Sequence, residues 1–80
     1  MSEVEKLHKI SLRTKIPAIV AMIEEYNSLG FNAALSLLYT SQIFKDLEDE
    51  KTKIWHFSNV LLYDLLMREK QENRIDYPDV

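Results

Sequence analysis

Residues 54–67 read Ile54-Trp55-His56-Phe57-Ser58-Asn59-Val60-Leu61-Leu62-Tyr63-Asp64-Leu65-Leu66-Met67, the densest run of large apolar side chains in the chain. Ser58 is a good N-cap, because its hydroxyl can accept a hydrogen bond from a backbone N–H group that lacks a partner inside the helix. No glycine or proline follows before about Glu72, and most residues in this range are strong helix formers. The stretch therefore predicts a short lead-in segment followed by a helix over 59–72.

This predicted helix is apolar on more than one face. At about 100° per residue, its leucines form one broad face, and Val60, Tyr63 and Met67 form a second face beside it. A surface helix needs an apolar stripe only about 100° wide. Either this is the central helix of the fold, or one face is left for another chain. Because tyrosine, tryptophan and methionine are enriched in interface cores, the second alternative predicts a partner-binding surface of Trp55, Val60, Tyr63 and Met67.

The composition limits the class of protein. Eighty residues allow one domain, and the absence of cysteine excludes disulfides and thiolate metal sites. A single glycine and two prolines argue against a turn-rich all-β fold. The net charge of -3 disfavours nucleic acid as the main partner. The acidic start is unlike a signal peptide and no apolar run reaches about 20 residues, so a cytoplasmic protein is expected.

The segment over 1–13 allows more than one interpretation. Ser2 with Glu5 matches a capping box, which predicts a solvated lead-in helix. The alternation of apolar residues over 10–14 would also suit a strand. A third interpretation is a basic arm that contacts nucleic acid, with Lys9, Arg13 and Lys15 as the phosphate-binding residues. The lead-in helix is preferred, because acidic residues dilute the positive charge.

The first main helix is expected over 15–29. Thr14 can cap it, Pro17 would lie in the first turn, where its missing N–H costs nothing, and Gly30 suits the left-handed position that ends a helix. The predicted core face consists of Ile16, Ile19, Val20, Ile23 and Tyr26.

The middle of the chain is expected to hold two further helical segments. Asn32 would cap a helix over 33–39, and Ser41 would cap a short helix over 42–48. A polar connector then leads to residue 54. The alternative is a hairpin of strands 43–47 and 53–57, which is disfavoured because the charged run between them contains no glycine.

These elements predict an all-α fold: a small bundle of three main helices plus a short extra helical turn, within a single domain over 1–80. The ordered core is expected over about 14–72, with a fraying tail over 73–80. We expect no catalytic residues, no cofactor and no metal, since the two histidines lack ligand spacing and the serines have no neighbouring glycine elbow.

A family resemblance covers about residues 16–70. The segments that carry it are Ile23-Glu24-Glu25-Tyr26, then Tyr39-Thr40-Ser41-Gln42-Ile43-Phe44-Lys45-Asp46-Leu47-Glu48-Asp49-Glu50, and Trp55-His56-Phe57-Ser58. In these the chain resembles a family of short bacterial helical proteins of unknown function, some of them encoded beside a protein like an ADP-ribosyltransferase toxin. The resemblance implies a neutralising or regulatory partner role and supplies no catalytic residues. The basic extension before Thr14 departs from the family's pattern.

The expected function is therefore a non-enzymatic protein–protein interaction module, antitoxin-like or regulatory, that binds another protein or a second copy of itself. The alternative is a small nucleic-acid-binding regulator that uses the basic arm.

Overall fold

The computed structural model describes residues 2–78, which form four α-helices, two 3-10 helices and no strand. The α-helices are α1 (Glu3–Asn27), α2 (Phe31–Tyr39), α3 (Gln42–Glu48) and α4 (Asn59–Glu72), and the 3-10 helices η1 (Glu50–Thr52) and η2 (Ile54–His56) join α3 to α4. The all-α class is confirmed. The number of helices differs from the prediction, because the structure has four α-helices and two 3-10 helices where three main helices and one extra turn were expected. The hairpin alternative is wrong, because residues 43–47 are helical.

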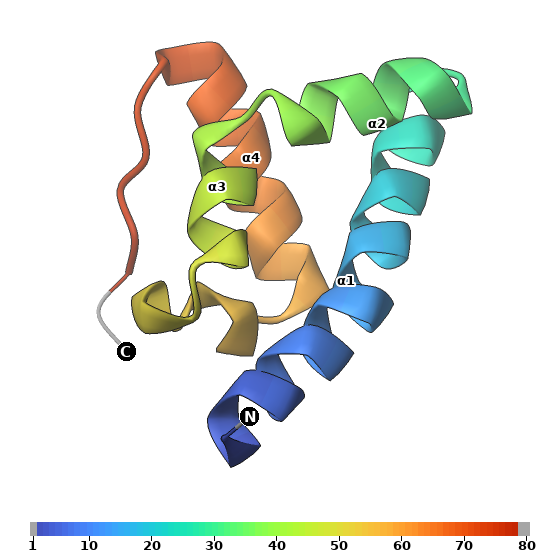
Figure 1. The fold of residues 1–80 in the computed structure, drawn as a ribbon. Coiled ribbons are helices and arrows are strands. Elements are labelled where there is room, and N and C mark those ends of the chain that lie inside the picture. Colours follow the sequence, from blue (N-terminus) through green and yellow to red (C-terminus); the bar gives the residue numbers. More distant parts are fainter. Residues whose placement is uncertain (1, 79–80) are drawn as a thin grey trace.

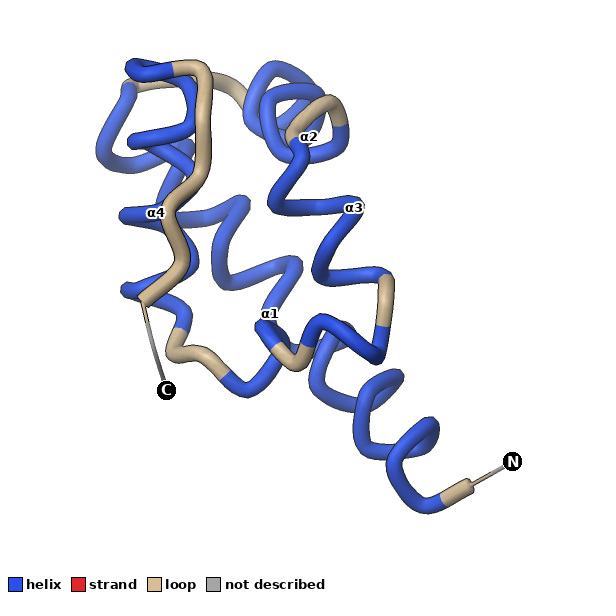
Figure 2. Tube along the Cα trace, turned by 90° about the vertical axis from the view of Figure 1, so that its left-hand side faces the viewer, coloured by secondary structure: helices blue, strands red, loops and turns tan. Residues whose placement is uncertain are grey.

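The helices enclose one core. In Figure 1, α1 runs along one side, α2 crosses its C-terminal end, and α3 and α4 lie next to each other. Figure 2 shows that the first turns of α1 project beyond the other helices. Every helical element except η1 contributes apolar side chains to the centre, and Phe57, which follows η2, adds one more. The buried apolar residues are Ile19, Val20, Ile23, Ala34, Leu38, Ile43, Leu47, Ile54, Trp55, Phe57, Leu62, Leu65 and Leu66.

The first helix starts earlier than predicted. The Ser2 hydroxyl accepts a hydrogen bond from the Glu5 backbone N–H at 3.1 Å, so the N-cap predicted there is confirmed. The prediction that Thr14 caps this helix is wrong, because its hydroxyl donates to the carbonyl of Ile10 inside a continuous helix. Pro17 consequently lies in the helix interior, where it leaves the carbonyl of Arg13 without its usual backbone donor.

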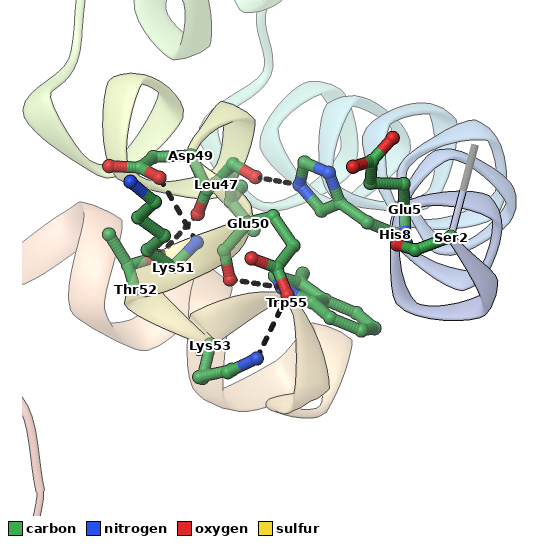
Figure 3. Close-up of polar contacts among 10 residues, drawn as sticks. All are labelled: Ser2, Glu5, His8, Leu47, Asp49, Glu50, Lys51, Thr52, Lys53 and Trp55. Atoms are coloured by element: carbon green, nitrogen blue, oxygen red, sulfur yellow. Dashed lines mark hydrogen bonds and ion pairs between the residues drawn. The ribbon is translucent and has the colours of Figure 1, made fainter.

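Contacts with the core explain the early start. His8 is only 8% exposed, and its Nε2 lies 2.7 Å from the carbonyl oxygen of Leu47. Because a carbonyl oxygen only accepts, Nε2 carries the hydrogen and donates it (Figure 3). The hydroxyl of Ser11 donates to the carbonyl of Trp55 at 3.1 Å. The segment before residue 14 is thus part of the packed structure.

The junction between α1 and α2 also differs from the prediction. Ser28, not Gly30, adopts the left-handed conformation, with φ of 52°. The N–H of Leu29 donates to the carbonyl of Glu24 at 3.2 Å, and the Leu29 side chain packs against the core. This hydrogen bond with its apolar contact is a Schellman motif, which ends α1 at Asn27, three residues before Gly30. Gly30 is extended and precedes α2 directly, so Asn32 lies inside α2 and does not cap it.

Two predicted caps are confirmed. The hydroxyls of Ser41 and Ser58 each accept a backbone N–H bond at 3.1 Å, from Phe44 and Leu61. A further cap is supplied by α4, because the carboxylate of Glu69 accepts from the first two N–H groups of α3, at 2.8 and 3.1 Å. A carboxylate at a helix N-terminus is favourable. This contact therefore ties α4 to α3.

The sequence predicts that the tail frays, but two side chains of residues 73–78 pack against the rest of the fold. Figure 1 shows the chain running back alongside the α3 and α4 pair after α4. Ile75 packs against the core, the Tyr77 hydroxyl donates to a carboxylate oxygen of Asp46, and the Tyr77 ring lies edge-on to Phe57 at 6.4 Å. Residues 79–80, also expected to fray, lie outside the described residues.

We expect the tail contact to make stability fall in alkaline solution. Burial, and then the hydrogen bond to Asp46, raise the pKa of Tyr77 above its ordinary value near 10. Above about pH 10 the unfolded state loses this proton first, so the stabilisation is lost as the pH rises. The decline in the urea midpoint between pH 8 and pH 11 should therefore be smaller in Tyr77→Phe than in wild type.

The comparison isolates this tyrosine. Burial lowers the pKa of Lys15, which gives a contribution of opposite sign, but that contribution is common to both proteins and cancels. Equal declines in the two proteins would contradict the proposed linkage.

Within residues 2–78, no helix combines the length and the apolar character needed to cross a membrane.

Candidate functional site

A groove runs between the C-terminal half of α1 and the start of α4. Its volume is about 520 Å³. We call it the α1–α4 groove, and its lining residues are Met22, Tyr26, Ser58, Val60, Leu61, Tyr63 and Asp64. Most of these side chains are apolar or aromatic, and the single ionic one is Asp64. Such a lining suits an apolar ligand surface better than a charged one.

Two tyrosines and an asparagine hold the groove's shape. The side-chain N–H₂ of Asn27 donates to the hydroxyl of Tyr63 and to the backbone carbonyl of Ile23, both at 3.1 Å. The Tyr26 and Tyr63 rings are tilted against each other with centroids 5.6 Å apart. The end of α1 and the first turns of α4 are thereby joined, and Tyr63 is fixed as a wall of the groove.

Val60 is the most exposed large apolar side chain among the described residues, at 68%. It lies in the first turn of α4, between the N-cap Ser58 and Leu61, whose N–H group donates to the Ser58 hydroxyl. The buried face of this helix consists of Leu62, Leu65 and Leu66. Val60 therefore contributes almost nothing to the core, and its side chain is available at the edge of the groove.

Trp55 does not belong to this surface, contrary to the sequence prediction. It is 4% exposed, and its indole N–H donates to the carbonyl of Glu50 at 3.0 Å (Figure 3). Its ring lies 5.3 Å from that of His8 and stacks on His56 at 3.9 Å. The 3-10 turn η2 places Trp55 against α1, so the residue anchors the fold.

Of the other three predicted partner-binding residues, two lie in the groove and one lies outside it. Val60 and Tyr63 lie together in the groove. Met67 is half-buried and packs against the core outside the groove. The structure thus brings together only the two residues nearest the start of α4.

Sequence reasoning missed the α1 wall of the groove. The core-face pattern of α1 included Tyr26, yet this side chain is 64% exposed because it lies in the last turn, past the buried Ile23. Met22 is half-buried on the neighbouring side of α1. A second apolar strip through Met22 is visible in the sequence, but nothing local shows that it faces α4.

The three basic residues of the nucleic-acid alternative do not form one surface. Lys9 and Arg13 are exposed and four residues apart, so they share a side of α1. Lys15 lies about 160° further around the helix from Arg13. Its ammonium group donates to the carbonyl of Phe57 at 2.6 Å, and burial lowers its pKa. Lys15 therefore helps to hold the start of α4.

The electrostatics of the groove are simple. Asp64 forms an ion pair with Arg68 at 3.1 Å, and both side chains are largely exposed, so the pair adds little stability. Elsewhere in residues 2–78, no three His, Cys, Asp or Glu side chains are grouped as a metal site would require. The chemistry that the groove offers is apolar contact with one negative charge among its lining residues.

Comparison of the chain with family models, with curated proteins and with solved structures gives no significant match.

Proposed function

We propose that this protein is a non-enzymatic interaction module whose α1–α4 groove receives an apolar helix of another protein. The observation that carries the proposal is the position of Val60, an apolar side chain left 68% exposed beside an aromatic wall. Tyrosine and methionine are enriched at interface cores, and Tyr26, Tyr63 and Met22 supply them here.

The shape and charge of the groove favour a helix as the occupant. A hollow between two helices accepts the apolar stripe of a third, with side chains at helical spacing as anchors. Asp64 is the single charged lining residue, so a stripe flanked by lysine or arginine would complement it. An antitoxin-like role, in which the chain neutralises a second protein by holding such a helix, is the form implied by the family resemblance.

The available contact energy suits a moderately tight complex. Burial of apolar surface contributes roughly 25 cal/mol per Å², so a few hundred Å² would contribute several kcal/mol before association costs. The Asn27–Tyr63 hydrogen bond holds one wall in place before binding, which reduces the ordering cost.

The proposal is tested by a substitution at the edge of the groove. The partner is captured on the wild-type chain, identified and purified, and its Kd is then measured by titration calorimetry. We expect Val60→Glu to raise the Kd by about 100-fold, because a carboxylate would be buried next to Asp64. Circular dichroism should show an unchanged fold, since Val60 is outside the core.

Phe31→Glu is the matched control. Phe31 is an exposed apolar residue on α2, away from the groove, and its replacement should leave the Kd within about twofold. A partner that binds wild type and Val60→Glu equally well would refute the groove as the binding site.

A further inference from the structure

A second apolar surface lies on the projecting end of α1. Val4, Leu7 and Ile10 are 40%, 54% and 59% exposed. They follow one another at intervals of three residues, so they form a continuous ridge along the helix. Val4 and Leu7 lie one turn before His8 and Ser11, the two residues whose hydrogen bonds fix these turns to the core. We call Val4, Leu7 and Ile10 the N-terminal ridge.

Charges of opposite sign lie at the two ends of this ridge. Glu3 is at its N-terminal end and Arg13 follows it at the other, and both are exposed. A parallel pairing of two such helices would place Glu3 against Glu3 and Arg13 against Arg13. An antiparallel pairing would place each Glu3 against the Arg13 of the other copy, and it would also oppose the two helix dipoles.

We infer that the N-terminal ridge is a contact between two copies of this chain, paired antiparallel. One register brings together both the Leu7–Ile10 pairs and the Glu3–Arg13 pairs of the two copies. In an antiparallel pair, the two-fold axis passes midway between the residues that face each other. For Leu7 and Ile10 this point lies about half a residue, or about 0.8 Å along the helix axis, from the point for Glu3 and Arg13. Leu7 of one copy therefore packs on Ile10 of the other in the register that brings Glu3 to Arg13.

This dimer is independent of the α1–α4 groove. The ridge ends at residue 10, whereas the first groove residue is Met22. The paired copies would leave both grooves open, so each dimer would present two binding sites to a partner. Two linked sites raise the apparent affinity for a partner that is itself multivalent.

The dimer is tested by sedimentation over concentrations from about 10 μM to about 1 mM, a range suited to a weak complex. The mass of the wild type should rise from the monomer value of 9.4 kDa towards twice that value. Leu7→Glu should weaken the association at least tenfold, or about 1.4 kcal/mol, because it places a carboxylate in the apolar contact. Phe31→Glu, on another surface, should behave as wild type does.

A charge exchange tests the antiparallel register. Glu3→Arg and Arg13→Glu should each weaken the dimer, because each places like charges together, and the double variant should restore it. Circular dichroism confirms the fold of each variant. A monomeric mass over the whole range, a dimer unaffected by Leu7→Glu, or a double variant as weak as the single ones would overturn the inference.

Discussion

Trp55→Ala is expected to lower the free energy of unfolding by about 3–5 kcal/mol, the usual cost of truncating a large buried aromatic side chain. The indole is 4% exposed and contacts the rings of His8 and His56. Its removal leaves a cavity where α1 meets η2 and leaves the carbonyl of Glu50 without the indole donor. The free energy of unfolding of a domain of this length is roughly 4–12 kcal/mol in total, so much of the variant should be unfolded at 37 °C.

Thermal unfolding followed by far-ultraviolet circular dichroism measures this effect, since the variant has no tryptophan fluorescence. The control is His56→Ala, which removes the stacked neighbour from an exposed position and should cost less than about 1 kcal/mol. If Trp55→Ala melts as the His56→Ala control does, Trp55 does not anchor the fold.

Pro17→Ala is expected to raise the free energy of unfolding by about 1–3 kcal/mol. Proline in a helix interior is about 3 kcal/mol less favourable than alanine, because the ring displaces the carbonyl four residues earlier and lacks an N–H. Alanine would restore the hydrogen bond to the carbonyl of Arg13. Two effects reduce the gain: proline also restricts the unfolded chain, and its ring lines a hollow of about 340 Å³ between α1 and α2.

Urea unfolding compares Pro17→Ala with wild type through the fluorescence of Trp55. Ala21→Pro is the matched control, because Ala21 is exposed one turn further along the same helix, and proline there should cost about 3 kcal/mol. A lower stability for Pro17→Ala would mean that the proline ring's contacts outweigh the missing hydrogen bond.

Local chemistry explains which elements were predictable. The bounds of α3 and α4 match the prediction because Ser41 and Ser58 cap them through hydrogen bonds between residues only three positions apart in the sequence. The leucines of α4 also follow a clear helical period. For these segments, sequence and tertiary structure agree.

Long-range contacts decided the parts that were mispredicted. The hydrogen bond from His8 reaches Leu47, 39 residues away, and no pattern within 1–13 indicates it. The contact between Tyr77 and Asp46 spans 31 residues. The end of α1 differs from the predicted one because the Leu29 side chain packs into the core, and the local sequence does not show where that core lies.

The candidate site was half predictable for the same reason. The sequence predicts Val60 and Tyr63 as surface residues because they lie on one side of a strongly periodic helix. Met22 and Tyr26 become a wall only when α1 lies against α4, which depends on the packing of both helices. The aromatic side chain of Trp55 suggests an interface residue, whereas its position in η2 buries it.

The central claim is that another protein covers the α1–α4 groove, and hydroxyl-radical footprinting of the free and the bound protein tests it most directly. Methionine and tyrosine oxidise readily when exposed, and Met22 and Tyr26 lie in the groove, whereas the exposed Tyr39 lies on α2. We expect complex formation to slow the oxidation of Met22 and Tyr26 and to leave the oxidation of Tyr39 unchanged. Unchanged oxidation of the two groove residues, with protection of Tyr39, would contradict the claim.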